Sequence, residues 1–139
     1  MFDGSRIRVP VVEKGSVSQQ TRMTFAHELT HACLASMGDW PAWLHEGLAQ
    51  KMSGETLHPS QRSMVVAALR QGRLPKLTNM GQTFARLSAA HAHLAYAYSA
   101  VAVDVMLERW KDYGLQNILR MPDRFGQITD ELDKLLASK

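Results

Sequence analysis

The chain contains a single cysteine, Cys33, so it cannot form an internal disulfide. No apolar run approaches the ~20 residues that a membrane-spanning helix requires, and the first residues lack the charged and apolar regions of a signal peptide. Basic residues never follow one another directly. These absences argue against a disulfide scaffold, a membrane span and a nucleic-acid-binding surface, and they leave the cellular compartment open.

What is present is the composition of an ordinary globular domain. Hydrophobic residues make up 45% and charged residues 21% of the 139 positions. This length fits one domain, residues 1–139, with a core of its own. Cys33 lies among apolar residues of a helical pattern, so we expect it to be a small buried hydrophobic side chain.

The most informative stretch is His27-Glu28-Leu29-Thr30-His31, a His-Glu-x-x-His pattern inside residues 19–37, which contain no Gly or Pro. Helical residues four apart lie about 40° apart around the axis, so both imidazoles project from one face and can bind one Zn²⁺. Glu28 lies about 100° from His27 and can instead accept a proton from a water molecule beside the metal. The stretch therefore predicts a zinc site on a helix, with Glu28 as general base.

The segment before this motif predicts one strand and the start of the motif helix. Residues 7–12 are mostly β-branched, and Pro10 restricts them to an edge strand. Ser16 and Gln19 have the spacing of a capping box, which predicts a helix that starts near residue 17 and ends at Gly38. Its apolar residues are widely distributed around the axis, so we expect a central helix buried on most sides.

A second helix is predicted over residues 41–51, with Asp39 as its N-cap. Glu46 is the only carboxylate inside it and has largely apolar neighbours. An unpaired carboxylate in such surroundings is unfavourable, so Glu46 either reaches solvent or binds a cation. A metal held by His27 and His31 would stabilise it.

The remaining sequence predicts further helices, which makes the fold mainly α with one short edge strand, in the α+β class. The predicted helices cover residues 59–71, 80–87 with Asn79 as cap, 89–110 with Ser88 as cap, 115–121, and a last segment from Thr129.

The run Pro-Ala-Trp-Leu-His-Glu-Gly-Leu-Ala over residues 41–49, placed after His-Glu-x-x-His, resembles the Pro-x-Trp-Leu-x-Glu-Gly-x-Ala signature of the peptidase MA-like gluzincins. These are zinc metallopeptidases with a zincin-like helical subdomain. The resemblance extends over most of the chain. It implies His27, His31 and Glu46 as zinc ligands, so that their ligand atoms should converge, and Glu28 as general base.

The resemblance also implies a tyrosine that donates a hydrogen bond to the developing oxyanion, and Tyr96 stands at that place. Tyr98 is its rival, about 200° further round the same helix, so only one of the two can face the metal. Gln50 stands where thermolysin-like relatives often carry an Asp that orients a zinc-binding His. The Gln50 amide oxygen could accept the same imidazole N–H.

Four further histidines have no place in the predicted ligand set. We expect His45 to be a partly exposed helix residue, with contact to the ligands or the substrate as the alternative. His58, His91 and His93 have no partner at ligand spacing, so we expect structural or solvent-facing roles for them.

The implied reaction is peptide-bond hydrolysis, in which Zn²⁺ lowers the pKa of a water molecule to roughly 7 and Glu28 takes its proton. Only about fifteen residues precede the motif helix, whereas gluzincins usually have several strands there. We therefore expect part of the N-terminal sheet to be missing or to belong to a longer parent. The alternative is a zinc-stabilised helical interaction module without peptidase activity. Substrate specificity and oligomeric state stay open.

Overall fold

The computed structural model describes Arg6 and residues 18–139, and this part of the chain is mainly helical, without a strand. Its elements are α1 (Gln19–Met37), α2 (Ala42–Ser53), α3 (Pro59–Arg70), η1 (Leu77–Asn79), α4 (Ala89–Arg120), η2 (Pro122–Arg124) and α5 (Phe125–Ala137). The predicted edge strand over residues 7–12 lies outside the described residues. None of these helices combines the length and the apolar character that a membrane crossing needs.

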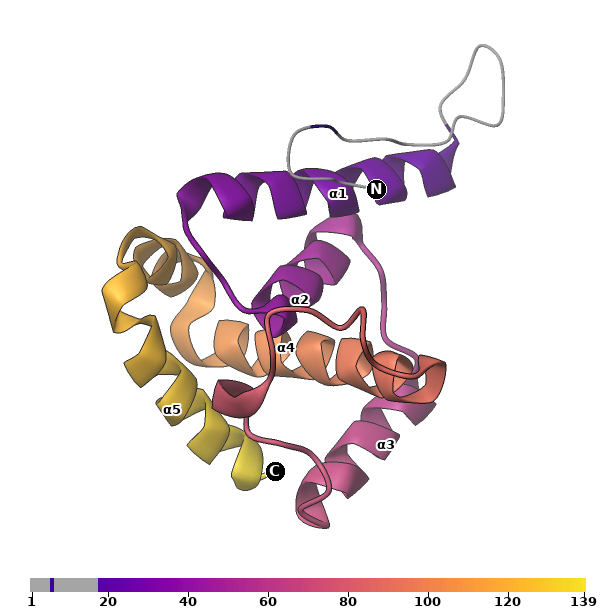
Figure 1. Cartoon of the computed structure of the whole chain (residues 1–139), viewed down its shortest axis with the longest axis vertical. Helices are drawn as coiled ribbons and strands as arrows, with labels where there is room; N and C mark the ends of the chain where they lie inside the picture. Colours follow the sequence, from indigo (N-terminus) through magenta and orange to yellow (C-terminus); the bar gives the residue numbers. More distant parts are fainter. Residues whose placement is uncertain (1–5, 7–17) are drawn as a thin grey trace.

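The longest helix, α4, is the centre of the core. Helices α2, α3 and α5 each pack against it, and α2 lies between α4 and α1 (Figure 1). The facing sides of α2 and α4 are fully buried, with Trp43, Leu44 and Met106 at 0% exposure. Because α2 is held against α4 on one side, its other side is fixed in place beneath α1, which carries the His-Glu-x-x-His motif.

Side-chain caps start three of the helices. The hydroxyls of Ser18 and Ser88 accept hydrogen bonds from backbone N–H groups in the first turns of α1 and α4. His58 caps α3, because its Nδ1 accepts from the Ser60 N–H at 3.2 Å. The predicted cap of α4 is confirmed, whereas α1 begins two residues later than predicted, with Ser18 in place of Ser16 as its cap.

Asp104 on α4 ties three helices together. Its carboxylate accepts a 2.8 Å hydrogen bond from Lys51 on α2 and another from Arg62 on α3. Burial raises the pKa of Asp104, but the hydrogen bonds and positive charges of Lys51 and Arg62 outweigh burial, and the net pKa is lowered. The lowered pKa keeps Asp104 ionised at neutral pH, so the pairs hold the C-terminal turn of α2 in place.

Helix α2 approaches α4 closely at Gly47, the residue after Glu46. A Cβ built on Gly47 would lie 2.4 Å from the backbone oxygen of Ser99 and 2.5 Å from a Val103 methyl group. Any other residue would therefore push the two helices apart.

We expect Gly47→Ala to lower the free energy of unfolding by about 1–3 kcal/mol, the usual effect of overpacking, as measured by urea denaturation. The matched control is Gly126→Ala on α5, where nothing lies within 4 Å of the added Cβ. That change should alter stability by less than about 1 kcal/mol. Equal effects of the two substitutions would mean that the α2–α4 contact is not tight at Gly47.

The prediction that α1 is buried on most sides is wrong. Only Thr21 and Leu34 of this helix are buried, and Phe25, Leu29 and Met37 are exposed by 48%, 42% and 44%. Within the described residues, α2 is the one helix that α1 packs against extensively, so its outer face has no cover there. Cys33 is exposed for the same reason, against the prediction that it is buried.

Four other details of the predicted helices differ from the structure. Asp39 does not cap α2, which begins after Pro41. Residues 80–87 form no helix, and the short 3₁₀ turn before them has an Asp133 carboxylate from α5 as the acceptor of the Leu77 N–H at 2.7 Å. The last helix begins at Phe125 rather than Thr129. The helices predicted over 89–110 and 115–121 are joined as α4 through a kink at Lys111, where φ is 59°.

Candidate metal centre

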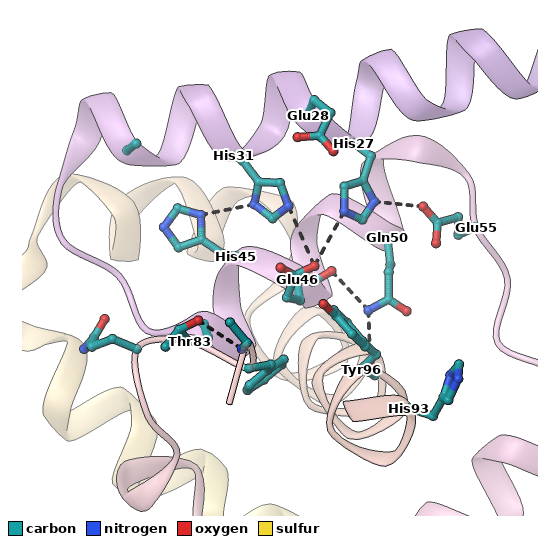
Figure 2. Close-up of a pocket in the computed structure, with 15 residues that line it drawn as sticks. His27, Glu28, His31, His45, Glu46, Gln50, Glu55, Thr83, His93 and Tyr96 are labelled. Carbon is teal, nitrogen blue, oxygen red and sulfur yellow. Dashed lines mark hydrogen bonds and ion pairs between the residues drawn. The ribbon is translucent and has the colours of Figure 1, made fainter. Parts of the chain in front are cut away.

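Two neighbouring helices bring the predicted ligand atoms together. His27 and His31 project from the side of α1 that faces α2, and Glu46 projects from α2 between them (Figure 2). Glu46 Oε2 lies 3.5 Å from His27 Nε2 and 3.7 Å from His31 Nε2. One ligand atom from each of the three side chains lies within 4.8 Å of the other two. Glu46 thus points into the site rather than into open solvent.

This arrangement fits a zinc ion. Tetrahedral bonds of about 2.0–2.1 Å place neighbouring ligand atoms about 3.3 Å apart, so the two observed imidazole–carboxylate distances need to shorten only slightly. Two imidazoles and one carboxylate form one of the donor sets of catalytic zinc sites. The Glu46 side chain is only 21% exposed, so a cation at this point would also neutralise a carboxylate that is largely removed from water.

His27 and His31, the two candidate ligand histidines, have different partners on their Nδ1 atoms. His27 Nδ1 lies 2.8 Å from Glu55 Oε1, and a carboxylate can only accept, so this nitrogen carries the proton. His31 Nδ1 lies 3.4 Å from His45 Nδ1. The sequence indicated Gln50 for this orienting role, but the Gln50 amide instead donates to the backbone oxygens of Glu46 and Tyr96.

Burial and the neighbouring charges set the pKa values of the histidines at this site. The hydrogen bond with Glu46 raises the pKa of His27 against the lowering effect of burial, and Glu55 raises it further. Burial lowers the pKa of His31, and burial together with the nearby His31 lowers the pKa of His45. His31 and His45 are therefore neutral at pH 7, the state in which an imidazole can bind a metal.

The ligand atoms line a cleft of about 710 Å³, which Glu28 and Tyr96 also line. Glu28 lies beside His27 on α1, and the Tyr96 ring extends from α4 toward Glu46 (Figure 2). Burial and the negative charge of Glu46 raise the pKa of Tyr96, so its hydroxyl keeps its proton and can act as a donor. Residues 82–85, ahead of α4, form part of the wall.

The structure separates the two tyrosine candidates. Tyr98 is 2% exposed, and its hydroxyl donates to the backbone oxygen of Pro75 at 3.2 Å, on the side of α4 away from the cleft. Tyr96 is the tyrosine that lines the cleft, with its ring edge-to-face against Phe84 at 5.5 Å.

The other histidines divide between structural positions and the cleft wall. His58 caps α3, and His91 Nδ1 lies 2.9 Å from the Ser88 hydroxyl that caps α4. His45 and His93 line the cleft, although neither is part of the three-residue ligand cluster. Glu55 is the site residue that the sequence did not single out, and its one signal was a carboxylate in the turn directly after α2.

Comparison of the chain with models of known protein families, with curated proteins and with solved structures finds no match. Functional inference for this chain therefore depends on its two sequence motifs and on the geometry of the cleft.

Proposed function

We propose that this chain is a zinc-dependent peptidase of the gluzincin type, in which His27, His31 and Glu46 hold the metal. The observation that carries the proposal is the convergence of these three ligand atoms in a cleft that Glu28 and Tyr96 share. A bound Zn²⁺ would supply a Lewis acid that makes water more acidic and a carbonyl group more electrophilic.

Glu28 and Tyr96 have complementary roles in the proposed reaction. The Glu28 carboxylate accepts a proton as the water oxygen bonds to the peptide carbonyl carbon, and it delivers that proton to the amide nitrogen as the C–N bond breaks. The Tyr96 hydroxyl donates a hydrogen bond to the carbonyl oxygen, on which negative charge develops. The products are a carboxylic acid and an amine.

Three packed helices hold the groups of the proposed reaction in place. α1 carries the base, α2 the carboxylate ligand and α4 the hydrogen-bond donor. These three groups therefore come from three helices, of which α2 packs against both α1 and α4. Groups fixed on helices keep their relative positions better than groups on loops, and correct positioning is a large part of catalysis.

Hydrolysis of unstructured peptides tests the proposal. We expect cleavage by protein that contains zinc, loss of cleavage with a chelator, and its recovery when Zn²⁺ is added. A chain that binds zinc at His27, His31 and Glu46 yet cleaves no peptide, even when it is extended upstream, would contradict the proposal.

That negative result would favour a zinc-stabilised interaction module, the second candidate function. The exposed apolar side chains of α1, Phe25, Leu29 and Met37, support this alternative, because apolar groups in such numbers on one helix favour association. Peptidase activity is the property that separates the two candidates.

Tyr96 and Tyr98 form a matched pair for testing the donor role. We expect Tyr96→Phe to lower kcat about 10²–10³-fold, as for the loss of an oxyanion donor, with zinc content unchanged. Tyr98→Phe removes the hydrogen bond to Pro75 and should lower stability by about 1 kcal/mol without affecting kcat. Equal kcat values for Tyr96→Phe and the unmodified chain would exclude Tyr96 from the reaction.

A further inference from the structure

The turn that ends α2 places the Glu55 carboxylate next to Nδ1 of His27, the ring nitrogen that faces away from Glu46. Glu55 Oε1 lies 2.8 Å from His27 Nδ1, while the other ring nitrogen, Nε2, faces Glu46 at 3.5 Å (Figure 2). The imidazole of His27 is thus held between two carboxylates, one on each nitrogen. In the neutral imidazole that a metal requires, a proton on Nδ1 that is hydrogen-bonded to Glu55 leaves the lone pair on Nε2, the nitrogen that faces Glu46.

The backbone fixes the position of Glu55. Gly54 has a left-handed φ of 80°, and the Glu55 N–H donates to the Gln50 oxygen at 3.0 Å while the Gly54 N–H donates to the Lys51 oxygen at 3.3 Å. This pair of bonds is the Schellman motif, which ends a helix in one defined geometry. The backbone of Glu55 is therefore held in a defined position, although this residue lies outside the helix.

A buried hydroxyl fixes the Glu55 side chain. Ser53 is 8% exposed, and its Oγ lies 2.9 Å from Glu55 Oε1 and 3.0 Å from the Gln50 oxygen. The same carboxylate oxygen thus accepts from both Ser53 and His27. Two donors on one oxygen restrict the rotation of the carboxylate.

We propose that Glu55 is the positioning residue of His27, holding its ring in the tautomer and orientation that present Nε2 to the metal. This inference rests on the proposed zinc site and deepens it. His31 has a weaker arrangement, because its partner is the His45 imidazole at 3.4 Å rather than a carboxylate. Glu55 occupies the role that the sequence indicated for Gln50, from five residues further along the chain.

The test measures zinc affinity by competition with a chromophoric chelator, on the whole chain. We expect Glu55→Ala to weaken zinc binding about 10–100-fold, the usual effect of losing such a partner. Glu55→Gln keeps an oxygen that can accept the His27 N–H, so its loss should be smaller. Glu108→Gln, which removes an exposed carboxylate paired with Lys139 at the surface, is the control and should bind as the unmodified chain does.

The visible absorption spectrum of the Co²⁺-substituted protein shows whether Glu55 positions His27 or only stabilises the fold. With Co²⁺ in place of zinc, the visible absorption bands of Glu55→Ala should shift in position, because the orientation of one ligand changes. The bands of Glu108→Gln should not shift.

Two negative results are distinguishable. If the unmodified chain binds zinc through His27, His31 and Glu46 while Glu55→Ala binds it equally well with the same Co²⁺ spectrum, the positioning role is wrong and the proposed function stands. If the unmodified chain binds no zinc, both are wrong.

Discussion

Replacement of Glu28 by Gln should lower kcat for peptide hydrolysis by about 10²–10⁴-fold, the contribution of a positioned general base, while one zinc per chain is retained. Gln has nearly the size and hydrogen-bonding capacity of Glu but cannot accept a proton at neutral pH. Because Glu28 lines the cleft but lies outside the cluster of three ligand atoms, its charge is not required for metal binding.

His31→Ala provides the contrast to this variant. It removes a ligand, so it should lose zinc and hydrolysis together. The two variants are compared by metal analysis and by initial rates with one peptide substrate. A Glu28→Gln chain with full activity would exclude the general-base role, and one that had lost its zinc would place Glu28 in the ligand set instead.

Removal of the metal should lower the melting temperature by on the order of 10 °C without unfolding the chain at room temperature. Zinc that binds only the folded site stabilises it by about 4 kcal/mol when free metal is 1,000-fold above Kd, and each kcal/mol shifts the melting temperature of a domain of this size by a few degrees. The proposed site would join α1 to α2, so removal of the metal would remove a link between two helices that pack on each other.

The core explains why the metal-free chain should stay folded. The fully buried side chains of α2 and α4, such as Trp43, Leu44 and Met106, pack together away from the ligand atoms. The far-ultraviolet helical signal should therefore persist after chelation at room temperature. A chain that loses this signal when metal is removed would favour the interaction module. If a chelator removed zinc from the loaded chain without changing its melting temperature, the prediction that bound zinc stabilises the fold would be wrong.

The sequence could predict those features that depend on neighbours close along the chain. The helical spacing of His27 and His31 sets their common face, and the Ser88 cap marks the start of α4. The convergence of Glu46 on these histidines was expected from the resemblance of the two motifs to those of the gluzincins, whereas the residues alone left Glu46 either in solvent or on a cation.

Features that depend on distant partners could not be predicted in this way. The 3₁₀ turn at Leu77 is capped by Asp133, which lies 56 residues further along the chain. The choice between Tyr96 and Tyr98 depends on which side of α4 meets Pro75, and helical spacing states only that the two rings point in different directions. Glu55 reaches His27 across 28 residues through a turn that the sequence marks only as a break.

Metal analysis of protein purified without chelator tests the zinc site most directly. We predict about one zinc per chain for the unmodified protein, and less than a tenth of that for His27→Ala, for His31→Ala and for Glu46→Ala after dialysis. Tyr98→Phe, whose hydroxyl lies outside the cleft, should keep the full amount. An unmodified chain without zinc that also fails to take it up, or a Glu46→Ala chain with undiminished zinc, would contradict the proposed site.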